Sequence, residues 1–107
     1  MPNIMKMIKQ ANEIQKNMAK TQTDLAAQSL EASSGGGAVT VTITGTGDIT
    51  AVKIAPDAAK SGDAEMLEDL VLAAIKSAQE LARDTSSKAM AKVTGGLQLP
   101  SGLGFGL

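Results

Sequence analysis

The chain has 107 residues, a formal net charge of −1, one aromatic side chain (Phe105), and neither histidine nor cysteine. This inventory excludes disulfides and thiolate metal sites, removes the commonest general base, and gives no overall attraction to nucleic acid or to acidic membranes. A core must therefore come from Ala, Val, Ile, Leu and Met, and because a chain this short buries only about two-thirds of its unfolded surface, we expect association to supplement a modest core.

Residues 3–27 are predicted to form a helix. Its apolar residues recur at alternating steps of three and four, which is the spacing of a heptad seam. The seam has one polar member and comprises Ile4, Met7, Ala11, Ile14, Met18, Thr21 and Leu25. A helix of this length extends about 37 Å, so it overhangs a small domain. Its seam then needs a second surface, either the later long helix or a partner chain.

The side of this helix opposite the seam carries four lysines at the c and f positions of the heptad, namely Lys6, Lys9, Lys16 and Lys20. Glu13 interrupts the stripe at another c position. Lysines at such positions are typical of the solvated face of a coiled coil, but a basic stripe is also what phosphates require. The pattern alone leaves both interpretations open. A second, looser basic group lies further along the chain and comprises Lys76, Arg83, Lys88 and Lys92.

Residues 28–55 are predicted to form an antiparallel β-meander. The stretch "SLEAS" is a weak strand candidate, "AVTVTIT" at 38–44 alternates apolar residues with threonine, and "ITAVKI" at 49–54 places Val52 and Ile54 opposite Lys53. Period-two alternation of β-branched residues between glycine turns is typical of such strands. We expect a sheet with one apolar face and one threonine-rich face.

A second long helix is predicted after the loop "APDAAKSGD", which has room for a helical turn at Pro56. Asp63 is placed to cap this helix, which spans residues 64 to about 93 and ends at the glycine pair 95–96. Its apolar stripe is broad enough to cover a sheet and comprises Leu67, Leu70, Val71, Ala74, Ile75, Ala78, Leu81 and Ala82.

These elements predict one α+β domain, in the order α-β-β-β-α, over residues 1–96. Residues 97–107 are glycine-rich and carry no charged side chain, so we expect a flexible tail that folding does not require. No apolar run approaches the roughly 20 residues of a membrane span, and the N-terminus lacks the apolar segment of a secretory signal. A cytoplasmic location, with no membrane partner, is the resulting expectation.

No constellation of residues predicts catalysis, a metal or a cofactor. Glu65, Glu68 and Asp69 cluster where the second helix starts, where acidic residues favour the helix dipole. The glycine-rich stretches at 35–37 and 45–48 lack the lysine and hydroxyl residues of a phosphate-binding loop and are explained by hairpin turns. The methionines have no cysteine or histidine beside them, which favours packing over metal binding. We therefore expect neither an enzyme nor a protein that binds a small-molecule substrate.

Three stretches resemble the YbaB/EbfC family of bacterial nucleoid-associated proteins. They are "IMKMIKQANEIQKNMAKTQTDLA", "VTVTITGTGDITAVKIAPD", and "DAEMLEDLVLAAIKSAQELARD" followed by "GGLQLPSG". The resemblance spans nearly the whole chain. It implies a homodimer of α-β-β-β-α subunits whose helices project like tweezers, binding of duplex DNA with little sequence specificity, and a role in nucleoid organisation and gene regulation.

The resemblance supplies no motif that fixes the DNA-contacting residues. We assign them from the helical pattern as Lys6, Lys9, Lys16 and Lys20. The alternative function is a protein-interaction adaptor of the same fold with weak or no DNA binding, which the acidic balance of the chain and its apolar C-terminal stretch favour.

Overall fold

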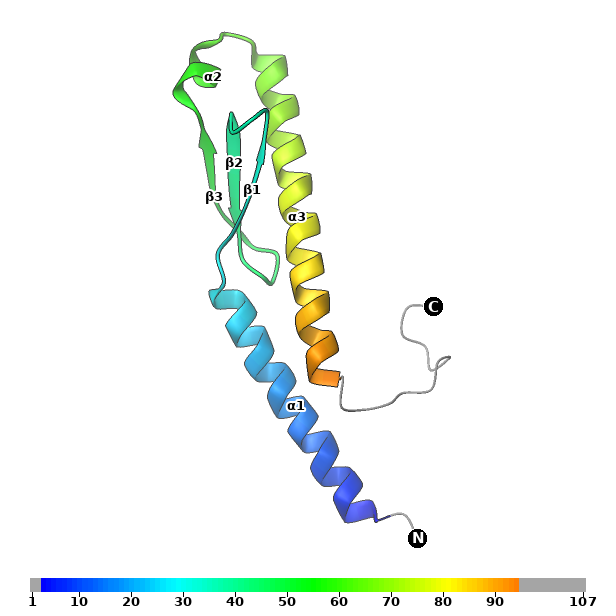
Figure 1. The fold of residues 1–107 in the computed structure, drawn as a ribbon. Coiled ribbons are helices and arrows are strands. Elements are labelled where there is room, and N and C mark those ends of the chain that lie inside the picture. Colours follow the sequence, from blue (N-terminus) through cyan, green and yellow to red (C-terminus); the bar gives the residue numbers. More distant parts are fainter. Residues whose placement is uncertain (1–2, 95–107) are drawn as a thin grey trace, which may run out of the picture.

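The computed structural model describes residues 3–94. The elements follow the order α1 (Ile4–Ala27), β1 (Leu30–Ser34), β2 (Val39–Ile43), β3 (Ile49–Ile54), α2 (Pro56–Lys60) and α3 (Ala64–Thr94) (Figure 1). This confirms the predicted α-β-β-β-α order, and the helical turn at Pro56 is present as α2. The expected tail at 97–107 and the glycine pair at 95–96 lie outside the described residues.

Side-chain caps fix where the two long helices begin. The Asn3 side chain accepts a hydrogen bond from the backbone N–H of Lys6, over 3.2 Å, at the start of α1. Asp63 accepts one from the backbone N–H of Met66, over 3.0 Å, and so caps α3 as predicted. Each cap satisfies one of the backbone donors that the first turn of a helix leaves unpaired.

The sheet is an antiparallel meander in the order β1-β2-β3. The three glycines 35–37 that join β1 to β2 have φ angles of 60°, 65° and 100°, a region that glycine adopts without steric cost. In the β2–β3 register Val41 lies opposite Val52, and Val39 lies opposite Ile54. Because paired residues of an antiparallel sheet point to the same side, the apolar side chains of both strands share one face.

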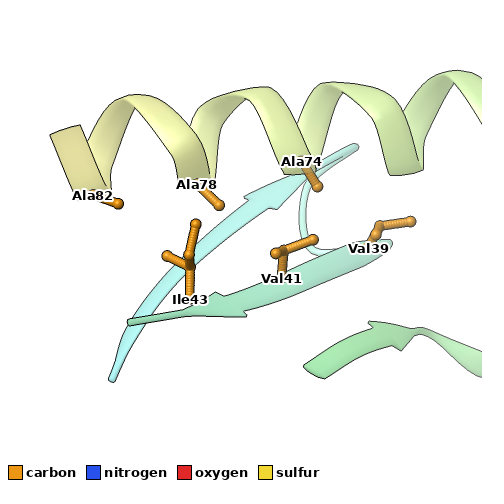
Figure 2. Close-up of a cluster of buried hydrophobic side chains, with 6 residues drawn as sticks. All are labelled: Val39, Val41, Ile43, Ala74, Ala78 and Ala82. Carbon is orange, nitrogen blue, oxygen red and sulfur yellow. The ribbon is translucent and has the colours of Figure 1, made fainter. Parts of the chain in front are cut away.

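The core lies where β2 faces α3. Val39, Val41 and Ile43 are fully buried and point towards three buried alanines of the helix (Figure 2), namely Ala74, Ala78 and Ala82. Alanines four residues apart form one line along a helix, and their small side chains let the helix approach the strand closely. The predicted apolar stripe of α3 is confirmed at these positions, with Leu70, Val71 and Ile75 packed around them.

The same substitution at a buried and at an exposed isoleucine tests where this core lies. Ile43→Ala should lower the free energy of unfolding by about 2–5 kcal/mol, because it removes buried methyl groups and leaves a cavity. Ile4→Ala makes the same change where 67% of the side chain is exposed, so its effect should stay within about 0.5 kcal/mol. Urea denaturation at one fixed protein concentration measures both values. Equal losses would contradict a core centred on β2.

Helix α1 is anchored at its C-terminal end and extends away from the sheet in a molecule of 72 × 27 × 15 Å (Figure 1). Leu25 is buried, and its carbonyl accepts a hydrogen bond from the backbone N–H of Gly45 over 2.9 Å. A Cβ at Gly45 would lie 2.9 Å from the Leu25 carbonyl oxygen, a backbone atom that the hydrogen bond holds in place, so the contact requires glycine there.

The predicted seam of α1 is covered only in part. Leu25 is buried and Thr21 and Ile14 are half-buried, whereas Ile4 and Met7 are 67% and 58% exposed. Because α3 ends beside the C-terminal part of α1, it cannot cover the rest of the seam. The N-terminal half of the seam therefore has no partner within the described chain.

Candidate nucleic-acid interface

All four predicted site residues lie on α1 and are exposed, namely Lys6, Lys9, Lys16 and Lys20. Their spacings of three, seven and four residues keep them on one side of the helix. Leu25, which anchors the helix, belongs to the other side, so the lysines point away from the contact with the sheet. We call this set the lysine stripe.

The lysine stripe gives α1 a charge that differs from that of the whole chain. Its four lysines oppose only Glu13 and Asp24 within the helix, which leaves a local charge of +2 where the chain has −1. Every residue from 4 to 13 is exposed, so the N-terminal half of the helix extends away from the sheet and from α3 (Figure 1). A long polyanion could follow this half of α1 without meeting the sheet.

A groove of about 760 Å³ lies between α1 and α3. Lys20 of the stripe lines it together with Lys88 and Lys92 of α3, and the acids Asp24 and Asp84 line it too. Lys88 Nζ lies 3.1 Å from Asp84 Oδ2, but both side chains are mostly exposed, and such surface pairs contribute little. Lysines from two helices therefore meet beside one groove.

The second basic group of the sequence does not stay together in the structure, where Lys76 lines neither of the two hollows that its other members line. Lys88 and Lys92 join Lys20 at the groove, whereas Arg83, the only arginine of the chain, lines a separate hollow with the turn at 45–47. Sequence periodicity could not make this division, because it depends on which side of α3 the first helix packs against. Lys88 and Lys92 are thus candidate contacts that the helical pattern of α1 missed.

The described residues show neither a metal-ligand cluster nor an unsatisfied buried polar side chain. Within 3–94, no group of acidic, histidine or cysteine side chains is arranged to hold a metal ion. Over the same range, no buried side-chain nitrogen or oxygen lacks a hydrogen-bond partner. None of the helices described is both long enough and apolar enough to cross a membrane.

Comparisons with known proteins agree with the resemblance read from the sequence. Residues 1–97 match the model of the YbaB/EbfC DNA-binding family. A nucleoid-associated protein of Alkaliphilus metalliredigens is 43% identical over 99 residues, covering 92% of this chain and 87% of the relative. The nucleoid-associated protein GDI3467 of Gluconacetobacter diazotrophicus is 44% identical over 105 residues, covering 98% of each chain.

A solved structure shows the same fold. The uncharacterized protein HP0035 from Helicobacter pylori superposes with a TM-score of 0.77, covering 89% of this chain and all of that one. Its sequence identity is 15%, so the likeness concerns the fold alone.

Proposed function

We propose that this chain, which belongs to the YbaB/EbfC DNA-binding family, binds duplex DNA as a homodimer through the lysine stripe of α1, with little preference for sequence. The observation that carries the proposal is the placement of four exposed lysines on one side of a helix that protrudes from the sheet. In this role the protein would act in the bacterial nucleoid, contributing to its organisation and to gene regulation, and would need no catalytic residue.

Phosphate contact is the mechanism that these residues support. Lysine is a compact point charge on a flexible stem, which neutralises phosphates without reading bases. Neutralised phosphates release condensed counterions, and this release drives binding and makes it weaken with salt. Lys88 and Lys92 add two candidate contacts where α3 meets α1.

Weak sequence preference follows from the same inventory. Base readout usually relies on arginine, asparagine or glutamine held at a groove. The only arginine, Arg83, lies away from the stripe. Five amide side chains of α1 are exposed and could supply at most a modest preference, namely Gln10, Asn12, Gln15, Asn17 and Gln22.

An uncovered apolar surface on β3 supports the homodimer. The apolar row of β2 continues onto β3, but α3 packs against β1 and β2 and leaves β3 at the edge (Figure 2). Ile49, Val52 and Ile54 are consequently 42%, 47% and 38% exposed. We call these three residues the β3 strip. An apolar edge strand with unpaired backbone groups is a natural pairing surface.

Helix α3 also exposes an apolar side chain on the side that borders the turn into β3. Leu72 is 51% exposed and lies seven residues before Gln79, so both share one side of the helix. Gln79 lines the hollow at the turn that leads into β3. Two copies that cover the β3 strip and Leu72 about a twofold axis would leave both α1 helices projecting, with eight stripe lysines on two arms.

A titration of duplex DNA by gel shift at several salt concentrations tests the proposal. If four to eight lysines neutralise phosphates, the logarithm of affinity should fall with the logarithm of salt at a slope between roughly −4 and −7. Duplexes of unrelated sequence should bind within about tenfold of one another. No binding at low salt would instead favour the protein-interaction adaptor.

A further inference from the structure

The free end of α1 is unusually apolar for an exposed surface. Four of its first five residues are large apolar side chains with more than half of their surface exposed, namely Ile4 (67%), Met5 (78%), Met7 (58%) and Ile8 (52%). Lys6 lies among them and Lys9 follows. Isolated exposed apolar residues need no explanation, but a cluster at the tip of a protruding helix indicates a contact.

The four residues divide between two sides of the helix. Ile4 and Met7 belong to the seam, and Ile8 follows Ile4 by four residues on that same side, where a second helix could cover all three. Met5 precedes Lys9 by four residues, so it neighbours that lysine on the side of the lysine stripe. Coverage of the seam by another chain would therefore leave Met5 open, and its side chain is the most exposed of the large apolar side chains described.

We propose that Met5 is an apolar wedge, which enters the duplex between base steps while Lys6 and Lys9 hold neighbouring phosphates. This inference rests on the proposed DNA binding. Proteins that bend DNA frequently insert side chains such as methionine between base steps, which unstacks them and kinks the duplex by about 20–90°. The unbranched, polarisable side chain of methionine adapts to such an irregular gap.

Charge favours an anionic partner for this tip, and the match to a DNA-binding family selects DNA among such partners. Lys6 and Lys9 flank Met5 on the same exposed side of α1, and no acidic residue precedes Glu13 in the helix. A polyanion that also offers an apolar interior, the base stack, complements both features together. A bound homodimer would place one wedge at the end of each arm.

The experiment compares DNA bending with DNA affinity. A short duplex with a donor and an acceptor dye at its ends is titrated with the full chain, and energy transfer should rise on binding. Met5→Ala should abolish at least three-quarters of that rise. Its affinity should stay within about fivefold of the wild type, because the gain from burying Met5 is offset by the unstacking it causes. The salt slope should not change, since no phosphate contact is lost.

Two further variants separate a wedge from a general loss of structure. Met18→Ala makes the same change on the seam side of α1, where 39% of the side chain is exposed, and should bend DNA like the wild type. Met5→Leu keeps an apolar side chain and should restore most of the bend. Circular dichroism checks that each variant keeps its helix.

The outcomes distinguish this inference from the proposed function. Wild-type binding without any rise in energy transfer, or an undiminished rise with Met5→Ala, would overturn the wedge while leaving DNA binding intact. Absence of wild-type binding would overturn both. Met5-dependent binding to vesicles that contain anionic lipid, without DNA bending, would reassign the tip to a membrane surface and also overturn the wedge.

Discussion

Duplex binding is expected to disappear when Lys6, Lys9, Lys16 and Lys20 are all replaced by glutamine. Each lysine that contacts a phosphate contributes about −0.9 to the salt slope, so a dimer that loses eight lysines loses most of the electrostatic driving force. Glutamine has nearly the helix propensity of lysine, so α1 should persist. Fluorescence anisotropy of a labelled duplex at low salt measures the loss, which should exceed a hundredfold in affinity.

Lysines elsewhere provide the matched control. Lys53, Lys60 and Lys76 are also exposed but lie outside α1, and replacing all three with glutamine should change affinity by less than about fivefold. The triple variant of Lys6, Lys9 and Lys16 removes the same charge from the stripe and should weaken binding far more. Equal effects of the two triple variants would mean that net charge matters and the stripe does not. Unchanged affinity in the quadruple variant would move the site to the α3 lysines.

Local patterns in the sequence were sufficient to predict each secondary-structure element. Strict alternation over "AVTVTIT" predicted β2, and the three residues it assigned to one face are all fully buried. Asp63 acts as the predicted cap. These signals are local, because strand alternation, helix periodicity and capping each depend on residues that are close to one another along the chain.

Contacts between elements could not be predicted in the same way. The apolar stripe of α3 showed that it covers a sheet, but not that it leaves β3 uncovered. The alternation in "ITAVKI" correctly placed Val52 and Ile54 on one face, yet both are exposed because that face extends beyond the helix. Likewise the seam of α1 gave no sign that α3 would cover only its C-terminal end.

The candidate site likewise has one part that a local pattern predicts and one part that depends on contacts between elements. The lysine stripe follows from the spacing of residues on one helix, so the sequence alone could predict it. Lys20, Lys88 and Lys92 come together only because α1 packs against α3. In the sequence, all three strands lie between these two helices. No pattern within either helix carries that information.

A charge in the β3 strip is expected to separate the proposed homodimer. Val52→Glu would bury one carboxylate from each copy at the interface, and an unpaired buried charge costs several kcal/mol. Two such charges should raise the dimer dissociation constant by roughly three orders of magnitude or more, since about 1.4 kcal/mol corresponds to a factor of ten. Light scattering after size exclusion should then give a mass near 10.9 kDa where the wild type gives twice that value.

Two variants with the same new charge decide which surface mediates association. Ala51→Glu lies next to Val52 but on the opposite face of β3, opposite Thr42, and should leave the dimer intact. Met7→Glu places the charge in the uncovered half of the α1 seam and should also leave it intact if the β3 strip is the interface. Dissociation by Met7→Glu but not by Val52→Glu would move the interface to the seam. In that arrangement the two α1 helices would pair with each other, and the lysine stripes would form one rod in place of two arms.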